Sequence, residues 1–209
     1  MYTILQKPEI LDWNSIPVVC IDTRLWTPEI DIAATAQVCY DAEALYVRLT
    51  AKEAYIRAEE SGPLGIPCRD SCLEFFFSPV ANDKRYFNLE FNPRKCMYLG
   101  LGTGRDDSIR LLPDPDNVFH PCTARTEDGW EISYQIPFSF IKLFFTDFIA
   151  APGKKMLANF YKCGDYTVQE HYFAWKPVNN TTPDFHRPEY FGELIFDENI
   201  CTEQAAHRW

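Results

Sequence analysis

The stretch 70–102, DSCLEFFFSPVANDKRYFNLEFNPRKCMYLGLG, decides the fold that the sequence predicts. It holds three apolar and aromatic runs, at 70–79, 86–93 and 96–102, and Asn82-Asp83 turns the chain between the first two. The middle run alternates, because one face would carry Phe87, Leu89 and Phe91 and the other face Tyr86, Asn88, Glu90 and Asn92. Short alternating runs bounded by turn residues predict three consecutive antiparallel strands.

The flanking sequence continues this pattern in both directions. Residues 33–40 and 44–51 predict a hairpin around Asp41-Ala-Glu, and 130–138 alternates after the turn Asp128-Gly129. Further strands are expected at 16–21, 118–127, 156–164 and 191–196. One helix is expected, at 139–150, where Ser139 can cap the start of SFIKLFFTDFIA. Strands about ten residues apart predict an all-β, antiparallel sandwich with one short helix, forming a single domain over 1–209.

Composition supports a sheet protein and narrows its ligands. Aromatic residues make up 15% of the chain, and such side chains suit pleated sheets. The net charge of −10 argues against nucleic acid and against anionic membrane surfaces, which both need a basic face, whereas a neutral ligand such as a sugar is compatible with it. No apolar stretch is long enough to span a membrane.

The cysteines and the N-terminus indicate a compartment. The eight cysteines are scattered without a CxxC pair, and several fall inside predicted strands. We therefore expect reduced, buried thiols and a cytoplasmic location, since no signal peptide is visible at the N-terminus. Disulfides in an extracellular protein, after removal of a signal, are the alternative.

The stretch 171–196, HYFAWKPVNNTTPDFHRPEYFGELIF, is the most aromatic loop of the chain. Pro177, Pro183 and Pro188 exclude a regular helix and stiffen the segment. A rigid loop between strands commonly carries binding groups, although its rings could also bury one another.

Several motifs in order resemble a known family. They are DSCLEFFFSP, YFNLEFNP, WEISYQIPFSFI, ANFYKCGD and a W-K-P followed by PDFH-x-P-x-x-FG-x-L. From Ala33 to Phe196 the chain resembles the family-9-like carbohydrate-binding modules, which belong with the DOMON-like β-sandwiches. The resemblance implies a jelly-roll-like sandwich that binds glucose- or xylose-type sugars without catalysis, often at chain ends.

The resemblance also implies a site. In the family two tryptophan rings clamp a sugar while carboxylate, amide and basic groups bind its hydroxyls. Trp175 matches one clamp and Glu74 the carboxylate, whereas the chain carries GIPCRD (65–70) where the second tryptophan would fall. The candidate ligand-binding residues are Trp175 as the plate, Trp26 and Tyr98 as second plates, Glu74, Asn88 and Glu90 as polar groups, and His186 as part of the wall.

No cofactor is expected, apart from a structural calcium that the resemblance allows. No contiguous acidic loop has the spacing of an EF-hand.

Four alternatives remain open at this stage. Glu74 and Glu90 could pair as glycosidase carboxylates, and Met97 with His171 could ligate haem, as in some DOMON-like relatives. His171 and His186 with Asp184 or Glu170 could bind zinc, although their spacing matches no metal motif. The domain could also share only the fold and serve as an interaction module.

Overall fold

The computed structural model describes residues 1–201. Fourteen strands join in one sheet, in the order β10-β11-β5-β4-β1-β14-β12-β6-β7-β8-β9, with β2, β3 and β13 attached beside this path. The strands are β1 Tyr2–Gln6, β2 Val19–Ile21, β3 Thr23–Leu25, β4 Ala33–Tyr40, β5 Ala44–Lys52, β6 Cys72–Ser78, β7 Tyr86–Phe91, β8 Met97–Gly102, β9 Ile109–Leu111, β10 Cys122–Arg125, β11 Gly129–Pro137, β12 Lys155–Cys163, β13 Tyr172–Ala174 and β14 Gly192–Ile200.

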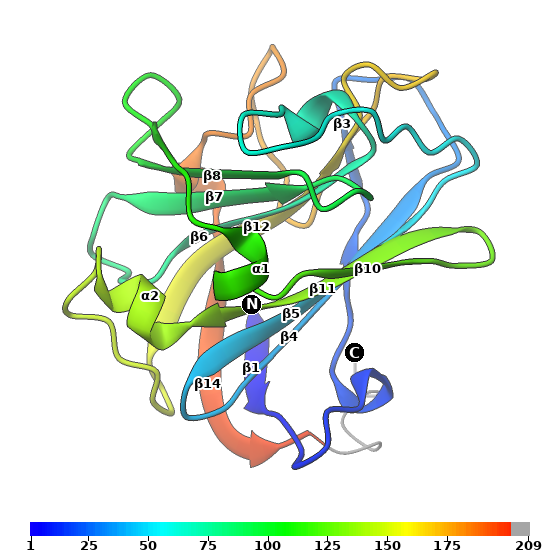
Figure 1. Ribbon diagram of the computed structural model, residues 1–209. Coiled ribbons are helices and arrows are strands. Elements are labelled where there is room, and N and C mark those ends of the chain that lie inside the picture. Colours follow the sequence, from blue (N-terminus) through cyan, green and yellow to red (C-terminus); the bar gives the residue numbers. More distant parts are fainter. Residues whose placement is uncertain (202–209) are drawn as a thin grey trace.

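The sheet curls so that its two halves cross face to face (Figure 1). Leu49 on β5 and Ile132 on β11 share one buried cluster with Phe75 on β6 and Leu89 on β7. Each strand alternates between this interior and its outer face, so burying both inner faces requires the two layers to pack on each other. The predicted β-sandwich is therefore confirmed.

The sheet is mixed, so the prediction of a strictly antiparallel sandwich is wrong at β1. This strand pairs in parallel with both β14 and β4. Parallel neighbours need a long connection, and the chain between β1 and β4 supplies one through β2 and β3. The predicted hairpin is present as β4–β5, and the predicted meander as β6–β7–β8.

The helix prediction at 139–150 is correct in place but wrong in length and cap. The helix α2, Phe138–Lys142, covers five residues, and its N-cap is Pro137 rather than Ser139. Tighter turns follow, such as Phe144 N–H to the Ile141 carbonyl and Phe148 N–H to the Phe145 carbonyl. Phenylalanine and other residues of middling helix propensity fill the segment, so burial of its rings decides its path.

Residues 1–201 hold further short helices that the sequence analysis did not predict. The helix α1, Pro115–Val118, ends at the first residue of the strand predicted at 118–127, which is shorter as β10, and Asp114 caps the helix by accepting from the Asp116 N–H. A Pro after a capping Asp is a usual helix start. The 3₁₀ turns are η1 Trp13–Ser15, η2 Pro67–Arg69 and η3 Pro188–Tyr190. No helix within residues 1–201 is long and apolar enough to cross a membrane.

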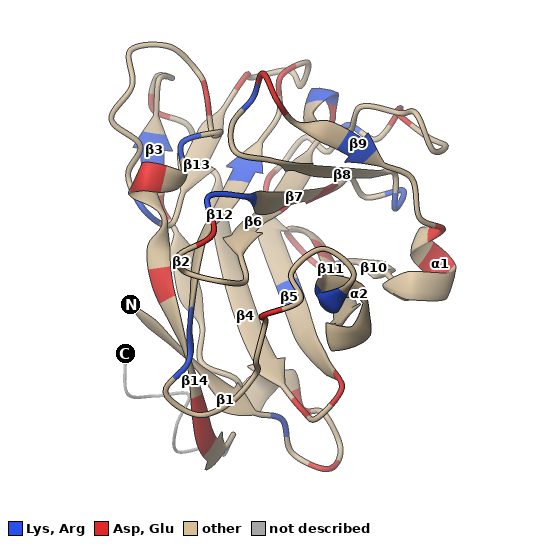
Figure 2. Cartoon of the chain, turned by 90° about the vertical axis from the view of Figure 1, so that its left-hand side faces the viewer, with Lys and Arg blue, Asp and Glu red and all other residues tan. Residues whose placement is uncertain are grey.

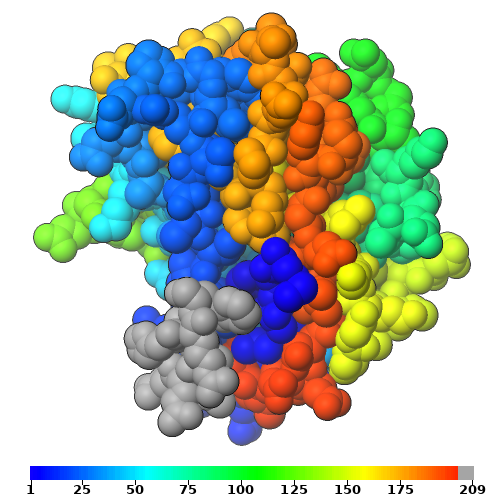
Figure 3. Space-filling model, turned by 180° about the vertical axis from the view of Figure 1, so that it is seen from behind, coloured from blue at the N-terminus to red at the C-terminus, as the bar shows by residue number. Residues whose placement is uncertain are grey.

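The outer face of β6, β7 and β12 is covered by the C-terminal loop segment rather than by solvent. Phe76 and Tyr86 pack there in a second buried cluster with Tyr161 and Phe185. As a result every residue of β6 and β7 is buried. The pairing of β3 with β13 brings the N-terminal region to the same place, and Figure 3 shows these blue and orange segments side by side from behind. Lys and Arg are interspersed with Asp and Glu on the side shown in Figure 2.

Candidate functional site

A cavity of about 160 Å³ lies over the outer face of β6 and β7, beneath the loops that cover it. Its floor comes from Glu74 on β6 and Glu90 on β7, which are directly opposed cross-strand partners. Its walls come from the chain just after β3, from β13 and from the loops around 105, 165 and 183–186. The lining residues are Trp26, Cys68, Glu74, Phe76, Glu90, Arg105, Cys163, Asp165, Tyr172, Pro183, Asp184, Phe185 and His186.

The floor holds two buried carboxyl groups. Glu74 is 2% and Glu90 7% exposed. Burial and the neighbouring charge of Glu90 raise the pKa of Glu74 well above its ordinary value. Burial raises the pKa of Glu90 to about 7, against the opposing hydrogen bond that Asn88 Nδ2 donates to Glu90 Oε1 at 2.9 Å. Such a pair holds a proton near neutral pH and can both donate and accept hydrogen bonds.

Asn88 and His186 support the floor from one side. The His186 Nδ1 atom lies 2.8 Å from Tyr86 Oη, and its Nε2 atom lies 3.5 Å from Asn88 Nδ2. Burial and the charge of Arg105 lower the pKa of His186 to about 4, so its ring is neutral at pH 7. The imidazole therefore acts as a fixed polar wall rather than as a charge.

One wall is aromatic. The Trp26 ring meets Tyr172 edge-on at 5.7 Å and Phe185 at 5.6 Å, and its Nε1–H donates to the Asn180 carbonyl at 2.6 Å. Trp26 adopts a left-handed backbone conformation, with φ of 53°. Such strain costs roughly 1 to 3 kcal/mol and persists only where the surroundings hold it. The ring is thus fixed in place, at the boundary with a neighbouring groove.

This groove has a volume of about 520 Å³ and shares Trp26, Tyr172 and Pro183 with the cavity. It continues past Thr27 to Ile30 and past Gln169 to Glu170. The cavity and the groove therefore adjoin each other at the Trp26 and Tyr172 rings.

Acidic groups outnumber basic groups in the cavity. The cavity is lined by four acidic residues, Glu74, Glu90, Asp165 and Asp184, and by one basic residue, Arg105. Arg105 is held at the rim by Asp184, whose Oδ1 lies 3.0 Å from Arg105 Nε. The arrangement favours a neutral ligand with hydroxyl donors over an anionic ligand.

Comparison with known proteins identifies the family of this chain. The model of carbohydrate-binding family 9 matches residues 5–196. The chain belongs to carbohydrate-binding family 9. No curated protein matches this family 9 chain significantly.

Solved structures share the fold of this family 9 chain. A protein from Bacteroides uniformis, described as a candidate carbohydrate-binding protein, is 25% identical with a TM-score of 0.77, over 94% of this chain and 99% of its own. A family 9 module from Caldicellulosiruptor kristjanssonii in complex with cellotriose is 13% identical, with a TM-score of 0.64 over 95% of this chain and 94% of its own. The complex of a family 9 module from the same organism with glucose is 13% identical, with a TM-score of 0.65 over 94% of this chain and 95% of its own.

The fold of this family 9 chain brings together most of the residues that the sequence singled out. Trp26, Glu74, Glu90 and His186 all line the cavity. Asn88 lies beneath it and holds Glu90. The polar face of β7 is therefore neither solvated nor a plain rim, because the covering loop encloses it.

Trp175 does not join this group, and its surroundings do not suit the plate that the sequence predicted. It is 9% exposed and belongs to the main core, where its ring packs against Phe160. The Lys176 ammonium lies 4.5 Å from the ring centroid. A Cβ atom at Gly192 would come within 2.8 Å of the ring. The Trp175 ring is thus enclosed by the protein, because its side chain is part of the core of the sandwich.

Tyr98 also lies outside the cavity lining. It faces Glu90 across β7 and β8, but its ring is covered by the Arg110 guanidinium at 4.6 Å. The Arg110 guanidinium therefore occupies one face of the Tyr98 ring.

The alternative ligand sets are not brought together. Met97 lines a different cavity from His171, and His171 a different cavity from His186. Among residues 1–201 the compact group of three or more His, Cys, Asp or Glu ligand atoms is Cys72, Glu74 and Cys163. Calcium prefers oxygen ligands, so this group does not fit the calcium that the resemblance implies. Calcium binding stays a prediction.

Several lining residues were not among the candidate sugar-binding residues of the sequence analysis. Asp184 and Phe185 belong to the PDFH motif, which could have indicated them. Tyr172 begins the same aromatic segment. Arg105 lies in the Gly- and Asp-rich loop between β8 and β9, and no sequence motif marks it as a site residue. Only the tertiary structure places this loop at the rim of the cavity.

Proposed function

We propose that this protein binds the terminal unit of a neutral saccharide, without catalysis, in the cavity between Trp26 and the Glu74–Glu90 pair. The observation that carries the proposal is the pair of buried carboxyls beside a fixed aromatic wall, in a chain of carbohydrate-binding family 9. Solved family 9 modules of the same fold are complexes with cellotriose and with glucose.

The chemistry of the cavity matches a sugar ring. Hydroxyl groups need donors and acceptors at fixed positions, and the carboxyl pair with the neutral His186 offers both. The C–H face of a pyranose is apolar and gains by covering an aromatic ring. Trp26 offers a half-buried ring at the cavity wall, so we assign it the plate role that the sequence suggested for Trp175.

The size of the cavity sets the length of ligand that it encloses. Its volume of about 160 Å³ is below the range of about 300 to 1,000 Å³ for sites that enclose drug-sized ligands, which favours one sugar unit. Further units would lie over Trp26 in the groove of about 520 Å³. The acidic balance favours neutral hexoses and pentoses over uronic acids.

Isothermal titration calorimetry with glucose, xylose, cellobiose, xylobiose and glucuronate tests the proposal. We expect binding of a neutral sugar. Trp26→Ala should weaken it about fivefold or more, because stacking of the sugar on an aromatic ring is worth about 1 kcal/mol or more, and Glu74→Gln should cause a similar loss. Tyr55→Ala is the control, since Tyr55 is an exposed aromatic on a different cavity. If no sugar binds, or if Trp26→Ala and Glu74→Gln bind as tightly as the parent, the proposal fails.

The same carboxyl pair is the reason to test for hydrolysis. Glycosidase carboxyls flank the scissile bond, about 5 to 9.5 Å apart, on opposite sides of the sugar. Glu74 and Glu90 instead stand next to each other on one floor, as direct cross-strand partners. Aryl glycosides should therefore stay intact, and hydrolysis that disappears in Glu74→Gln would show that the protein is an enzyme.

A further inference from the structure

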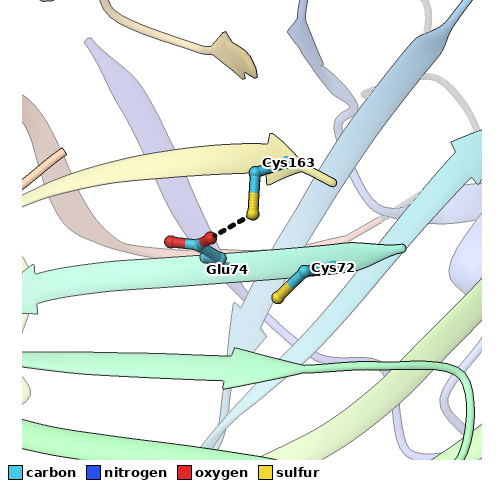
Figure 4. A group of neighbouring side chains, drawn as sticks. All are labelled: Cys72, Glu74 and Cys163. Atoms are coloured by element: carbon cyan, nitrogen blue, oxygen red, sulfur yellow. Dashed lines mark hydrogen bonds between the residues drawn. The ribbon is translucent and has the colours of Figure 1, made fainter. Parts of the chain in front are cut away.

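Two cysteines and a glutamate converge at the inner end of the cavity. The ligand atoms of Cys72, Glu74 and Cys163 all lie within 4.8 Å of one another. Figure 4 shows their side chains coming from the neighbouring strands β6 and β12. The register explains the convergence, because Cys163 is the direct partner of Cys72, and Glu74 follows two residues later on the same face of β6.

The three side chains are shielded from solvent. Cys72 and Cys163 are 0% and 1% exposed, and Glu74 is 2% exposed. The Cys163 thiol donates to Glu74 Oε1 at 2.9 Å. Burial raises the pKa of both thiols well above their ordinary values, so the group holds protons when no metal is bound. A buried carboxyl held by a thiol, rather than by Arg or Lys, is an unusual arrangement that a divalent cation would satisfy better.

The spacing fits a tetrahedral ion. Zinc takes thiolate ligands at about 2.3 Å, which sets two sulfur ligands about 3.8 Å apart in a tetrahedron. The three ligand atoms lie within 4.8 Å of one another, so small side-chain movements would complete this geometry. Two sulfurs and one oxygen favour zinc and similar soft ions over magnesium or calcium, which prefer oxygen alone.

The group is also reachable. Glu74 and Cys163 line the cavity, as does Cys68, whose carbonyl lies 3.7 Å from Cys163 Sγ. An ion can therefore enter from the cavity, and its fourth coordination position would face that space.

We propose that Cys72, Cys163 and Glu74 form a binding site for zinc or another thiophilic divalent cation. On binding, the two S–H bonds and any O–H bond of the Glu74 carboxyl break, two metal–sulfur bonds and one metal–oxygen bond form, and the protons pass to solvent. The site does not depend on sugar binding. Where the proposed sugar function also holds, the two ligands would compete for Glu74, which gives metal a direct effect on saccharide affinity.

The test is a titration of the reduced full-length chain with Co²⁺ and Zn²⁺, without sugar. Co²⁺ bound by two thiolates absorbs strongly in the near ultraviolet, and we expect one equivalent to produce this band and zinc to displace it. Cys72→Ser and Cys163→Ser should each reduce the band and weaken zinc binding by about tenfold or more. Cys20→Ser and Cys122→Ser are matched controls, because both thiols are exposed on other strands, and they should bind metal as the parent does.

A second measurement needs no variant and covers the case in which Cys163→Ser fails to fold. Thiol alkylation followed by peptide mass spectrometry, with denaturant added briefly, should show that zinc protects Cys72 and Cys163 but not Cys20. The absence of a thiolate band, protection of other cysteines instead, or unchanged binding in Cys72→Ser would overturn the proposal. If the protein binds sugar but no metal, only the metal-site proposal is refuted. If it binds metal but no sugar, only the proposed saccharide function is refuted.

Discussion

A buried ion pair connects the two layers of the sandwich. Lys162 Nζ on β12 lies 3.2 Å from Oε1 of Glu53, which follows β5, and both side chains are almost fully buried. The Glu53 carboxylate also accepts from Trp130 Nε1 at 2.7 Å and from Ser71 Oγ at 2.9 Å. The carboxylate therefore joins the end of β5 to β11, β12 and the residue before β6.

The Lys162 ammonium is fully used in the same network. Besides Glu53, it donates to the Cys163 carbonyl at 2.9 Å and to His171 Nε2 at 2.7 Å. An ammonium has three donors, so each finds a partner. His171 Nδ1 lies 2.8 Å from the Gln169 carbonyl, which assigns the ring proton to Nδ1 and leaves Nε2 to accept.

Lys162→Met removes the cation and leaves Glu53 buried and unpaired. At 3.2 Å the attraction is about 5 kcal/mol with an effective dielectric constant of about 20. Because burying the lysine also costs free energy, the expected loss is smaller, about 3 to 5 kcal/mol. The double variant Lys162→Met/Glu53→Gln should recover part of this loss, since a neutral amide can still accept from Trp130 and Ser71.

Urea unfolding at pH 7, followed by tryptophan fluorescence, measures these free energies. The matched control is Lys155→Met, which removes a lysine from the same strand whose partner, Glu193, is exposed by 43%. An exposed pair of this kind is worth about 0 to 1 kcal/mol. The reasoning is refuted if Lys162→Met costs no more than Lys155→Met, or if the double variant loses as much as the sum of its two single variants.

Three further outcomes can be measured on the same protein. Burial and the charge of Lys162 lower the pKa of His171 to about 4 from its ordinary 6.5. The stability that the neutral His171 ring contributes is therefore present above pH 6.5. It is lost, by up to about 3 kcal/mol, as the pH falls to 4. His171→Gln should therefore flatten the fall in unfolding free energy over that range, and an unchanged slope would contradict the assignment. Tyr134→Phe should leave stability equal or raise it by about 1 kcal/mol in the same urea assay, because the buried hydroxyl has no hydrogen-bond partner among residues 1–201; a loss above about 1 kcal/mol speaks against this. Gly129→Ala should lower the midpoint of thermal unfolding by several degrees or prevent folding, since a Cβ would lie 1.9 Å from the Ala51 carbonyl oxygen where β11 meets β5. A midpoint equal to that of the parent would show that this contact can relax.

Local sequence pattern was sufficient for most of the strands. The alternation in 86–91 and 130–137 predicted β7 and β11, because side-chain direction reverses at every residue of a strand whatever lies around it. The same reasoning failed for the polar face of β7. Alternation indicates that Asn88 and Glu90 point away from the core but cannot show that a loop a hundred residues later covers them.

The order of the strands in the sheet was beyond local pattern. The strand β1 lies between β14 and β4, in parallel with both, although these partners lie at opposite ends of the chain. The length of α2 was also not predictable from helical spacing, because the buried rings of Phe145 and Phe148 continue in turns rather than in helix.

The sequence by itself was sufficient for the β-sandwich and the family, since these depend on local alternation and on ordered motifs. It named seven candidate site residues, and four of them line the cavity: Trp26, Glu74, Glu90 and His186. The tertiary structure alone decided which tryptophan lines the cavity: Trp175 lies in the core next to Gly192, whereas Trp26 is held at the cavity wall by the Asn180 carbonyl. It also decided that Cys72 and Cys163, ninety-one residues apart by their numbering, share one strand register with Glu74 beside them. The physical reason is that burial and cross-strand contact are set by which segments pack together, and hydrophobicity along the chain does not specify that pairing.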